Sequence, residues 1–184
     1  KEIRTFVGHT QPITAANFNS DSSIFLSASR DGTLRIWDVA TGKMIKVINV
    51  TKPITTMMSS VGITIEGVQS AILSPDSQRI IVSYNACPDS GDCKMITNIF
   101  DRISGKNIQI SDNITPITFS NDGKYFFGKL PWLKNDGQGG VLVDFKSGIE
   151  IQSFRSYAQD DVHVLGFLST THSALYATES NVFL

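Results

Sequence analysis

The sequence predicts an all-β protein built from repeated antiparallel units of four strands. Two observations carry this expectation: apolar residues alternate at every second position, and two kinds of turn sequence recur in the same order along the chain. No window combines helical spacing of apolar residues with a cap before it and a glycine after it. The 184 residues are 41% hydrophobic and 18% charged, which is typical of a globular chain.

Charge and hydropathy exclude two classes of partner from the expected function. Sixteen Lys and Arg residues stand against seventeen Asp and Glu residues, so the formal net charge is −1 and no nucleic-acid partner is expected. No apolar run approaches the roughly 18 residues that cross a bilayer, and the first six residues lack a signal-peptide core. We therefore expect no membrane partner. The length fits one domain with a single core.

The first recurring turn places an aspartate after an apolar residue and four positions before a glycine. It occurs at Asp38, Asp101 and Asp144, which are 63 and then 43 residues apart. The second spacing lies within the roughly 40–45 residues of a repeated four-stranded unit. A second turn keeps the same phase at residues 19–23, 74–78 and 120–124. The two turns therefore mark the ends of successive strands.

Period-two alternation between these turns predicts half-buried strands. The alternating residues are Ile24, Leu26 and Ala28; Leu34 and Ile36; Ile45 and Val47; Ile80 and Val82; and Ile149 and Ile151. Insertions between the second and third strands are expected at residues 87–93 and near 135–140, where Gly, Asp or Pro are frequent. Residues 51–67 are expected to form a long connection, and the glycine run 137–140 a flexible hairpin tip.

The segment Gly8–Asp38 carries a specific motif. It begins with Gly8-His9, continues with Asp21 in a turn, and ends with residues 27–38, which read SASRDGTLRIWD. It resembles a WD repeat of the β-propeller family, and the match spans a full blade. The resemblance implies a buried, hydrogen-bonded structural tetrad of His9, Ser27, Asp31 and Trp37. A His, Ser and Asp could also suggest nucleophilic catalysis, but the family uses these residues to hold the blade together.

The later units depart from this pattern. Phe100 and Val143 stand where the first unit has tryptophan, and neither unit has a histidine at the matching place, so we expect these blades to lack the full tetrad. The expected blades cover approximately residues 7–48, 54–110, 111–154 and 157–184, with residues 1–6 as the outer strand of a preceding blade. Because closed propellers need about four to eight blades, we expect about 3–4 blades of a larger ring in a longer parent chain.

No constellation of side chains indicates an enzyme, a metal site or a cofactor. His163 follows Asp160 and Asp161, but no motif places a nucleophile or second acid beside it. Cys87 and Cys93 flank a five-residue loop, and three states are open. We expect free thiols before a hairpin disulfide, and either before a metal site, since no further thiolate or imidazole is nearby.

The resemblance implies a rigid platform that binds through the face whose loops lead into the innermost strand of each blade, which we call the entry face. Its expected exposed positions are Pro12, Thr14, Arg30, Gln69, Asn113, Thr115, Asp161 and His163. The predicted function is a noncatalytic scaffold, cytoplasmic or alternatively nuclear, whose partners are other proteins or peptides and the remaining blades of the parent chain. The alternative is the sensor or regulatory propeller of a larger signalling protein with a nucleotide-binding module.

Overall fold

The computed structural model of the protein describes residues 3–50, 63–88, 92–133, 137–156, 163–167, 174–177 and 182–183. These residues form four antiparallel sheets, the first three with four strands each and the last with three. In every sheet the strands pair in chain order. Within the described ranges, no helix is long and apolar enough to cross a membrane.

The strands are bounded as follows. The first sheet holds β1 (Ile13–Phe18), β2 (Ile24–Ser29), β3 (Thr33–Asp38) and β4 (Met44–Asn49). The second holds β5 (Ile63–Leu73), β6 (Arg79–Pro88), β7 (Lys94–Asp101) and β8 (Asn107–Asp112). The third holds β9 (Thr115–Phe119), β10 (Tyr125–Leu133), β11 (Gly137–Asp144) and β12 (Glu150–Ser156). The fourth holds β13 (His163–Phe167), β14 (Ala174–Ala177) and β15 (Val182–Phe183).

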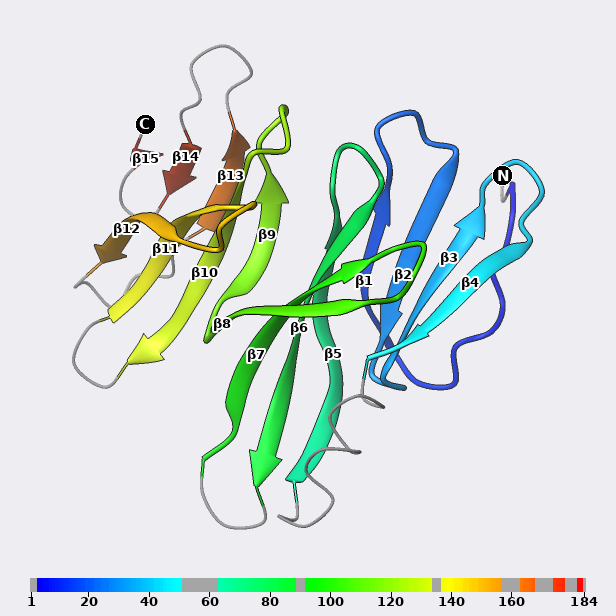
Figure 1. The fold of residues 1–184 in the computed structure, drawn as a ribbon, viewed down its shortest axis with the longest axis horizontal. Helices are drawn as coiled ribbons and strands as arrows, with labels where there is room; N and C mark the ends of the chain where they lie inside the picture. The colour runs from blue at the N-terminus through cyan, green and yellow to red at the C-terminus, as the bar shows by residue number, and fades with distance from the viewer. Residues whose placement is uncertain are drawn as a thin grey trace.

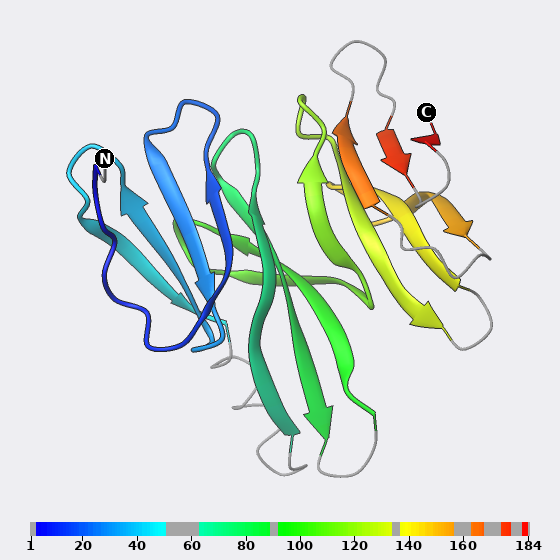
Figure 2. The same cartoon turned by 180° about the vertical axis from the view of Figure 1, so that it is seen from behind.

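The four sheets stand side by side in chain order, and the first strand of each is the innermost (Figures 1 and 2). Strand β1 contacts β5, β5 contacts β9, and β9 contacts β13. The sheets do not close into a ring, and the first and last lie at opposite ends of the arc (Figure 1). The predicted fold class, an incomplete portion of a propeller made of four-stranded blades, is therefore confirmed.

Both recurring turns are built by short side-chain contacts. Asp38 Oδ1 accepts hydrogen bonds from the backbone N–H and the hydroxyl of Thr41, at 2.6 and 2.5 Å, and Gly42 follows with a φ of 71°. The equivalent bonds join Asp101 to Ser104 and Asp144 to Ser147. A φ in this region suits glycine, which explains the fixed spacing from aspartate to glycine.

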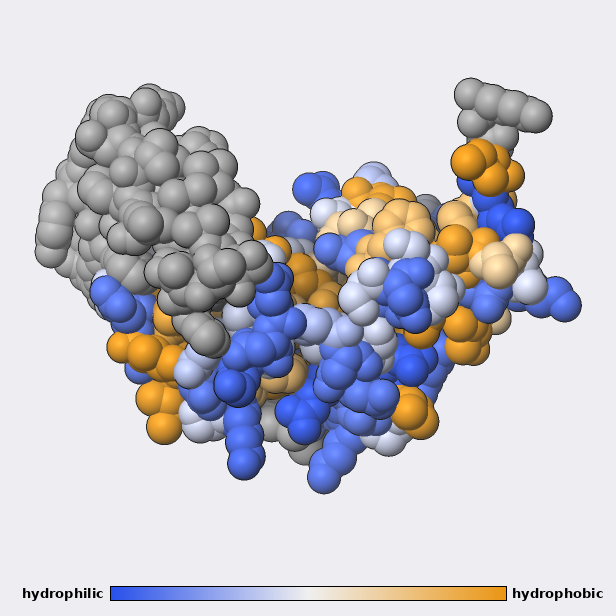
Figure 3. All heavy atoms as spheres, turned by 90° about the horizontal axis from the view of Figure 1, so that it is seen from above, coloured by the Kyte–Doolittle hydropathy of each residue, from blue (hydrophilic) through white to orange (hydrophobic). Residues whose placement is uncertain are grey.

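The turns between the first and second strands use a carboxylate in the same way. The hydroxyl of Ser74 donates to Asp76 at 2.6 Å, and that of Ser120 donates to Asp122 at 2.8 Å. The end of the sheets that carries these turns lies opposite the entry face. Seen from that end, hydrophilic side chains cover the middle of the arc, and apolar side chains are exposed toward the end formed by the first sheet (Figure 3).

Two apolar clusters join neighbouring sheets. The first lies between the first and second sheets and includes Leu26, Leu34 and Ile36 on one side and Ile80 and Phe100 on the other, each at most 1% exposed. A second cluster, around Phe126 and Ile81, joins the second and third sheets. Each side chain of this size contributes about 1.5–3 kcal/mol when fully buried, so inter-blade packing is the main source of stability.

Two local expectations were wrong. Residues 63–67 belong to β5 and not to a connection, because they pair with the far end of β6, with Ile63 opposite Pro88. The glycine run lies within β11 and is not a hairpin tip. Its backbone pairs with β10, and a Cβ at Gly140 would stand 2.3 Å from the Phe127 ring, so glycine is needed for packing.

The expectation that residues 1–6 form the outer strand of a preceding blade stays a prediction. Residues 3–9 form no strand, since no described strand lies beside them to supply a ladder. Instead Phe6 packs against Phe25 and Trp37, with ring centroids 5.0 and 5.5 Å apart. The segment therefore lies over the face of the first sheet that points away from the second.

Candidate functional site

Four side chains of the first blade form one hydrogen-bonded chain. The Nδ1 of His9 lies 2.8 Å from Asp31 Oδ2, and its Nε2 lies 2.8 Å from the hydroxyl of Ser27. The indole N–H of Trp37 donates to the same hydroxyl at 2.9 Å. All groups are satisfied when His9 donates from Nδ1 and accepts at Nε2. The bonds join the segment before β1 to strands β2 and β3.

Asp31 is the most heavily bonded member of this tetrad. Besides His9, it accepts from the backbone N–H and the hydroxyl of Thr33, at 2.9 and 2.6 Å, and from the backbone N–H of Thr10 at 3.1 Å. Burial acts to raise the pKa of Asp31, but the hydrogen bonds from Thr33, His9 and the two amides outweigh it and lower the pKa to about 2. Asp31 is thus a fixed carboxylate that anchors the loop entering β1.

The Ser27 hydroxyl is not placed for nucleophilic attack. Ser27 is 4% exposed, and its oxygen already bonds to both His9 and Trp37. A nucleophile needs access to substrate as well as a base, and this hydroxyl lacks that access. The geometry favours the structural role of these residues over a catalytic one.

Arg30 lies next to this anchored network and is exposed. Its backbone N–H donates to the carbonyl of Pro12 at 3.0 Å, while the hydroxyl of the preceding Ser29 donates to the carbonyl of Gln11 at 2.9 Å. On the other side, its backbone packs against Gly67 of the second blade. The structure therefore brings Pro12 and Arg30 together on the entry face, beside the first part of β5.

The other expected entry-face positions are dispersed. Thr14 is half-buried, and its hydroxyl has no hydrogen-bond partner among the described residues. Asn113 lies between β8 and β9 with a φ of 66°, and the Thr115 hydroxyl lies 2.9 Å from Met95 Sδ. Gln69 is a bulge residue of β5, His163 begins β13, and Asp161 lies outside the described residues.

The second blade has a longer hairpin between β6 and β7 than its neighbours, as the insertion expected at residues 87–93 predicts, but the length of the paired strands was not foreseen. Strands β5 and β6 continue past the ends of their neighbours and project from the entry face (Figure 1). Cys87 and Cys93 form a disulfide near the tip of the β6–β7 hairpin, which corrects the expectation of free thiols. The ladder that pairs Ala86 with Lys94 holds the two cysteines side by side. The alternation of Ile63 and Ile65 was a signal that could have revealed the longer strand.

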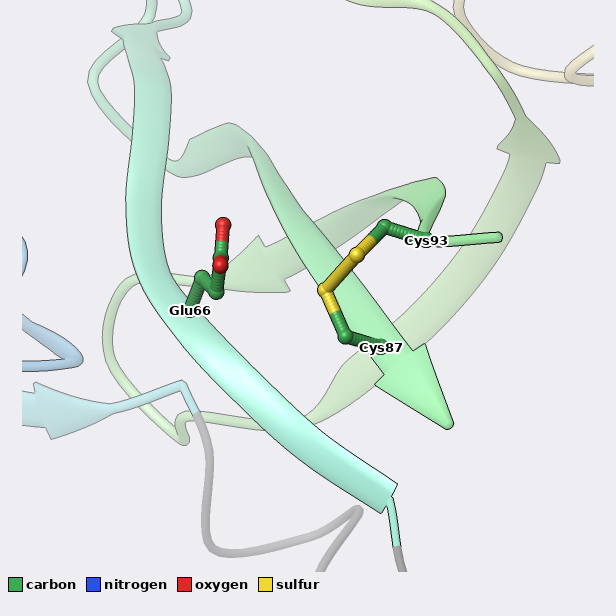
Figure 4. Close-up of side chains that lie close together, drawn as sticks. All are labelled: Glu66, Cys87 and Cys93. Carbon is green, nitrogen blue, oxygen red and sulfur yellow. A yellow bond between two sulfur atoms is a disulfide. The ribbon is translucent and has the colours of Figure 1, made fainter. Parts of the chain in front are cut away.

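Glu66 lies beside this disulfide. Its carboxylate and the two sulfur atoms lie within 4.8 Å of one another (Figure 4). Glu66 is exposed, as is Cys93, and Cys87 is half-buried. The cluster is thus open to solvent at the rim of the entry face.

The second and third blades hold together without the tetrad. The register places Val82 and Phe100 where the first blade has Ser27 and Trp37, and both are buried. In the third blade the same places hold Gly128 and Val143. Apolar packing and the recurring turns replace the polar network there.

Comparison with known proteins agrees with this architecture. The family model described as "WD domain, G-beta repeat" matches residues 1–38. The Set1 complex component swd2 of Schizosaccharomyces pombe is 26% identical over 149 residues, covering 81% of this chain and 37% of that protein. The solved structure of the Cps50 (Swd1) β-propeller domain of Myceliophteria thermophila superposes with a TM-score of 0.65 at 13% identity, covering 96% of this chain and 52% of that one.

Residues 1–38 match the WD-repeat family, and the fold of the chain is that of a β-propeller. A second relative, the COMPASS component SWD3 of Saccharomyces cerevisiae, is 27% identical over 131 residues, covering 69% of this chain. The chain spans 37% and 38% of the length of the two curated relatives. Only the first repeat retains the complete motif, which explains why the family model matches that repeat alone.

Proposed function

We propose that this WD-repeat chain is a noncatalytic scaffold that binds other proteins or peptides through its entry face. One observation carries the proposal: Arg30 is exposed, yet its backbone is fixed by Pro12, by Gly67 and by the adjoining anchored Asp31. A side chain on a fixed backbone loses little further freedom when it binds, so more of its interaction energy remains as affinity.

The chemistry of Arg30 indicates the kind of partner. A guanidinium donates two parallel hydrogen bonds to a carboxylate, and arginine is frequent among the residues that dominate binding energy. The start of β5 and the end of β6, which project from the entry face, form a wall beside it. An acidic side chain of a partner segment that lies against this wall would meet Arg30 and the Pro12 ring together.

The relatives support a role in assemblies. Two of them are named as components of the Set1 complex and of COMPASS. By analogy, we propose that this chain is a subunit of a multiprotein complex. These relatives favour the nuclear alternative over the cytoplasmic location that the sequence reading placed first.

Affinity purification with this chain as bait, followed by cross-linking, tests this function. Arg30→Ala is compared with Lys43→Ala, which removes an exposed cation of the same blade at the opposite end of the sheet. We expect Arg30→Ala to reduce recovery of partner proteins, Lys43→Ala to leave it unchanged, and cross-links to fall on the entry face. Equal recovery with both variants, or cross-links confined to the opposite end, would contradict the proposal.

A further inference from the structure

The projecting hairpin places three potential metal ligands together. They are the carboxylate of Glu66 and the sulfur atoms of Cys87 and Cys93, all within 4.8 Å of one another. We propose that, when the disulfide is reduced, these three groups bind one thiophilic divalent cation, with Zn²⁺ as the expected ion, and that disulfide formation releases it. This site is independent of the partner-binding role of Arg30.

The strand ladder keeps the ligands in place after reduction. Thr64 pairs with Cys87 and Glu66 with Asn85 across β5 and β6, so Glu66 lies one step diagonally from Cys87 on the same face. Ala86 pairs with Lys94, so Cys87 near the end of β6 and Cys93 just before β7 are held side by side. The backbone, rather than the disulfide, therefore sets the separation of the two thiols.

The geometry and charge of the cluster suit zinc. Metal–ligand bonds of about 2.0–2.3 Å bring tetrahedral ligands within roughly 4 Å of one another, a separation that the flexible Glu66 side chain can reach. Two thiolates and one carboxylate carry three negative charges, which more than balance the ion. Soft thiolate ligands select zinc over calcium or magnesium. Three protein ligands leave the fourth position to water, as in an open zinc site.

The redox step balances with a dithiol as reductant. The dithiol transfers two electrons and two protons, the S–S bond between Cys87 and Cys93 breaks, and the reductant closes its own disulfide. Binding of the cation then releases the two thiol protons. In the oxidised state only the Glu66 carboxylate remains as a strong ligand, so the affinity falls. Because Cys93 and Glu66 are exposed, both the reductant and the ion can reach the cluster.

Titration with Co²⁺, which replaces zinc and absorbs light when bound to thiolates, tests the site. The whole chain is reduced with dithiothreitol, freed of it by anaerobic gel filtration, and titrated beside the oxidised chain. We expect a thiolate-to-cobalt charge-transfer band that saturates at one equivalent in the reduced chain, is absent in the oxidised chain, and disappears when Zn²⁺ is added.

Matched variants assign the ligands. Glu66→Gln should keep the band but weaken Co²⁺ binding by about tenfold or more, whereas Cys93→Ser should remove the two-thiolate spectrum. Asp92→Asn changes a carboxylate of the same loop outside the cluster, and this variant should bind Co²⁺ as tightly as the unsubstituted chain. The absence of a band in the reduced chain, equal binding by the oxidised chain, or equal weakening by Asp92→Asn would each overturn the proposal. Circular dichroism verifies folding, and Glu66→Gln keeps the test decisive if Cys93→Ser unfolds.

Discussion

Gly67 lies against the backbone of Arg30, so close that a Cβ at residue 67 would stand 2.3 Å from the Arg30 Cα and 2.4 Å from its carbonyl oxygen. The contact joins the innermost strand of the second blade to the turn that follows β2 in the first. It also sets the position of Arg30 on the entry face. A glycine in one blade therefore controls the placement of a binding residue in its neighbour.

Gly67→Ala should destabilise the chain by about 1–3 kcal/mol, because the added methyl group meets backbone that cannot move aside. The comparison is Gly8→Ala, whose Cβ would meet the flexible end of the Arg35 side chain. Urea denaturation measures both free energies of unfolding. If the two substitutions lower the free energy of unfolding equally, the backbone contact between Gly67 and Arg30 does not exclude a methyl group.

Asp31→Ala should cost about 1–3 kcal/mol, since it leaves His9, Thr10 and Thr33 with donors that lose their acceptor. Asp21→Ala, which removes an exposed turn carboxylate from the same blade, should cost less. The melting temperatures of both variants provide the measurement. An unchanged melting temperature for Asp31→Ala would show that the tetrad does not stabilise the blade.

Acid should destabilise the fold between about pH 5 and pH 2. Hydrogen bonds lower the folded-state pKa of Asp31 and of Asp122 to about 2, below their usual value. These carboxylates therefore stabilise the fold above the unfolded-state pKa, and that contribution is lost as the pH falls through the folded-state pKa. Urea midpoints measured across this range should decline, and the decline should be shallower in Asp31→Asn. A flat profile would contradict the hydrogen bonding of these groups.

Arg30→Ala should change the free energy of unfolding by less than about 0.5 kcal/mol, because the side chain is exposed and only its backbone is packed. Partner recovery should nevertheless fall, since the guanidinium is the group proposed to meet the partner. A thermal melt run beside the affinity purification separates the two effects. Unfolding of this variant would mean that the side chain is structural.

Short-range patterns made most of the fold predictable from sequence. Asp38, Asp101 and Asp144 bond to residues three positions away, so their spacing alone reports the turn. The extension of β5 was not predicted, and the disulfide was placed second to free thiols, because both depend on how far two strands stay paired. The prediction of a hairpin tip at the glycines of β11 was wrong for a related reason. Gly140 is required because the Phe127 ring packs against it, and local sequence does not reveal that contact.

The tetrad can be transplanted only as a unit. Its members lie far apart in the sequence, with His9 and Asp31 separated by 22 positions, and each satisfies another. Phe100→Trp in the second blade would bury an indole N–H opposite a strand that offers Val82 where the first blade offers Ser27. That donor would lack the serine hydroxyl that Trp37 uses in the first blade, so Phe100→Trp alone would not rebuild the network. Engineering this chain toward regular repeats therefore calls for four exchanges made together.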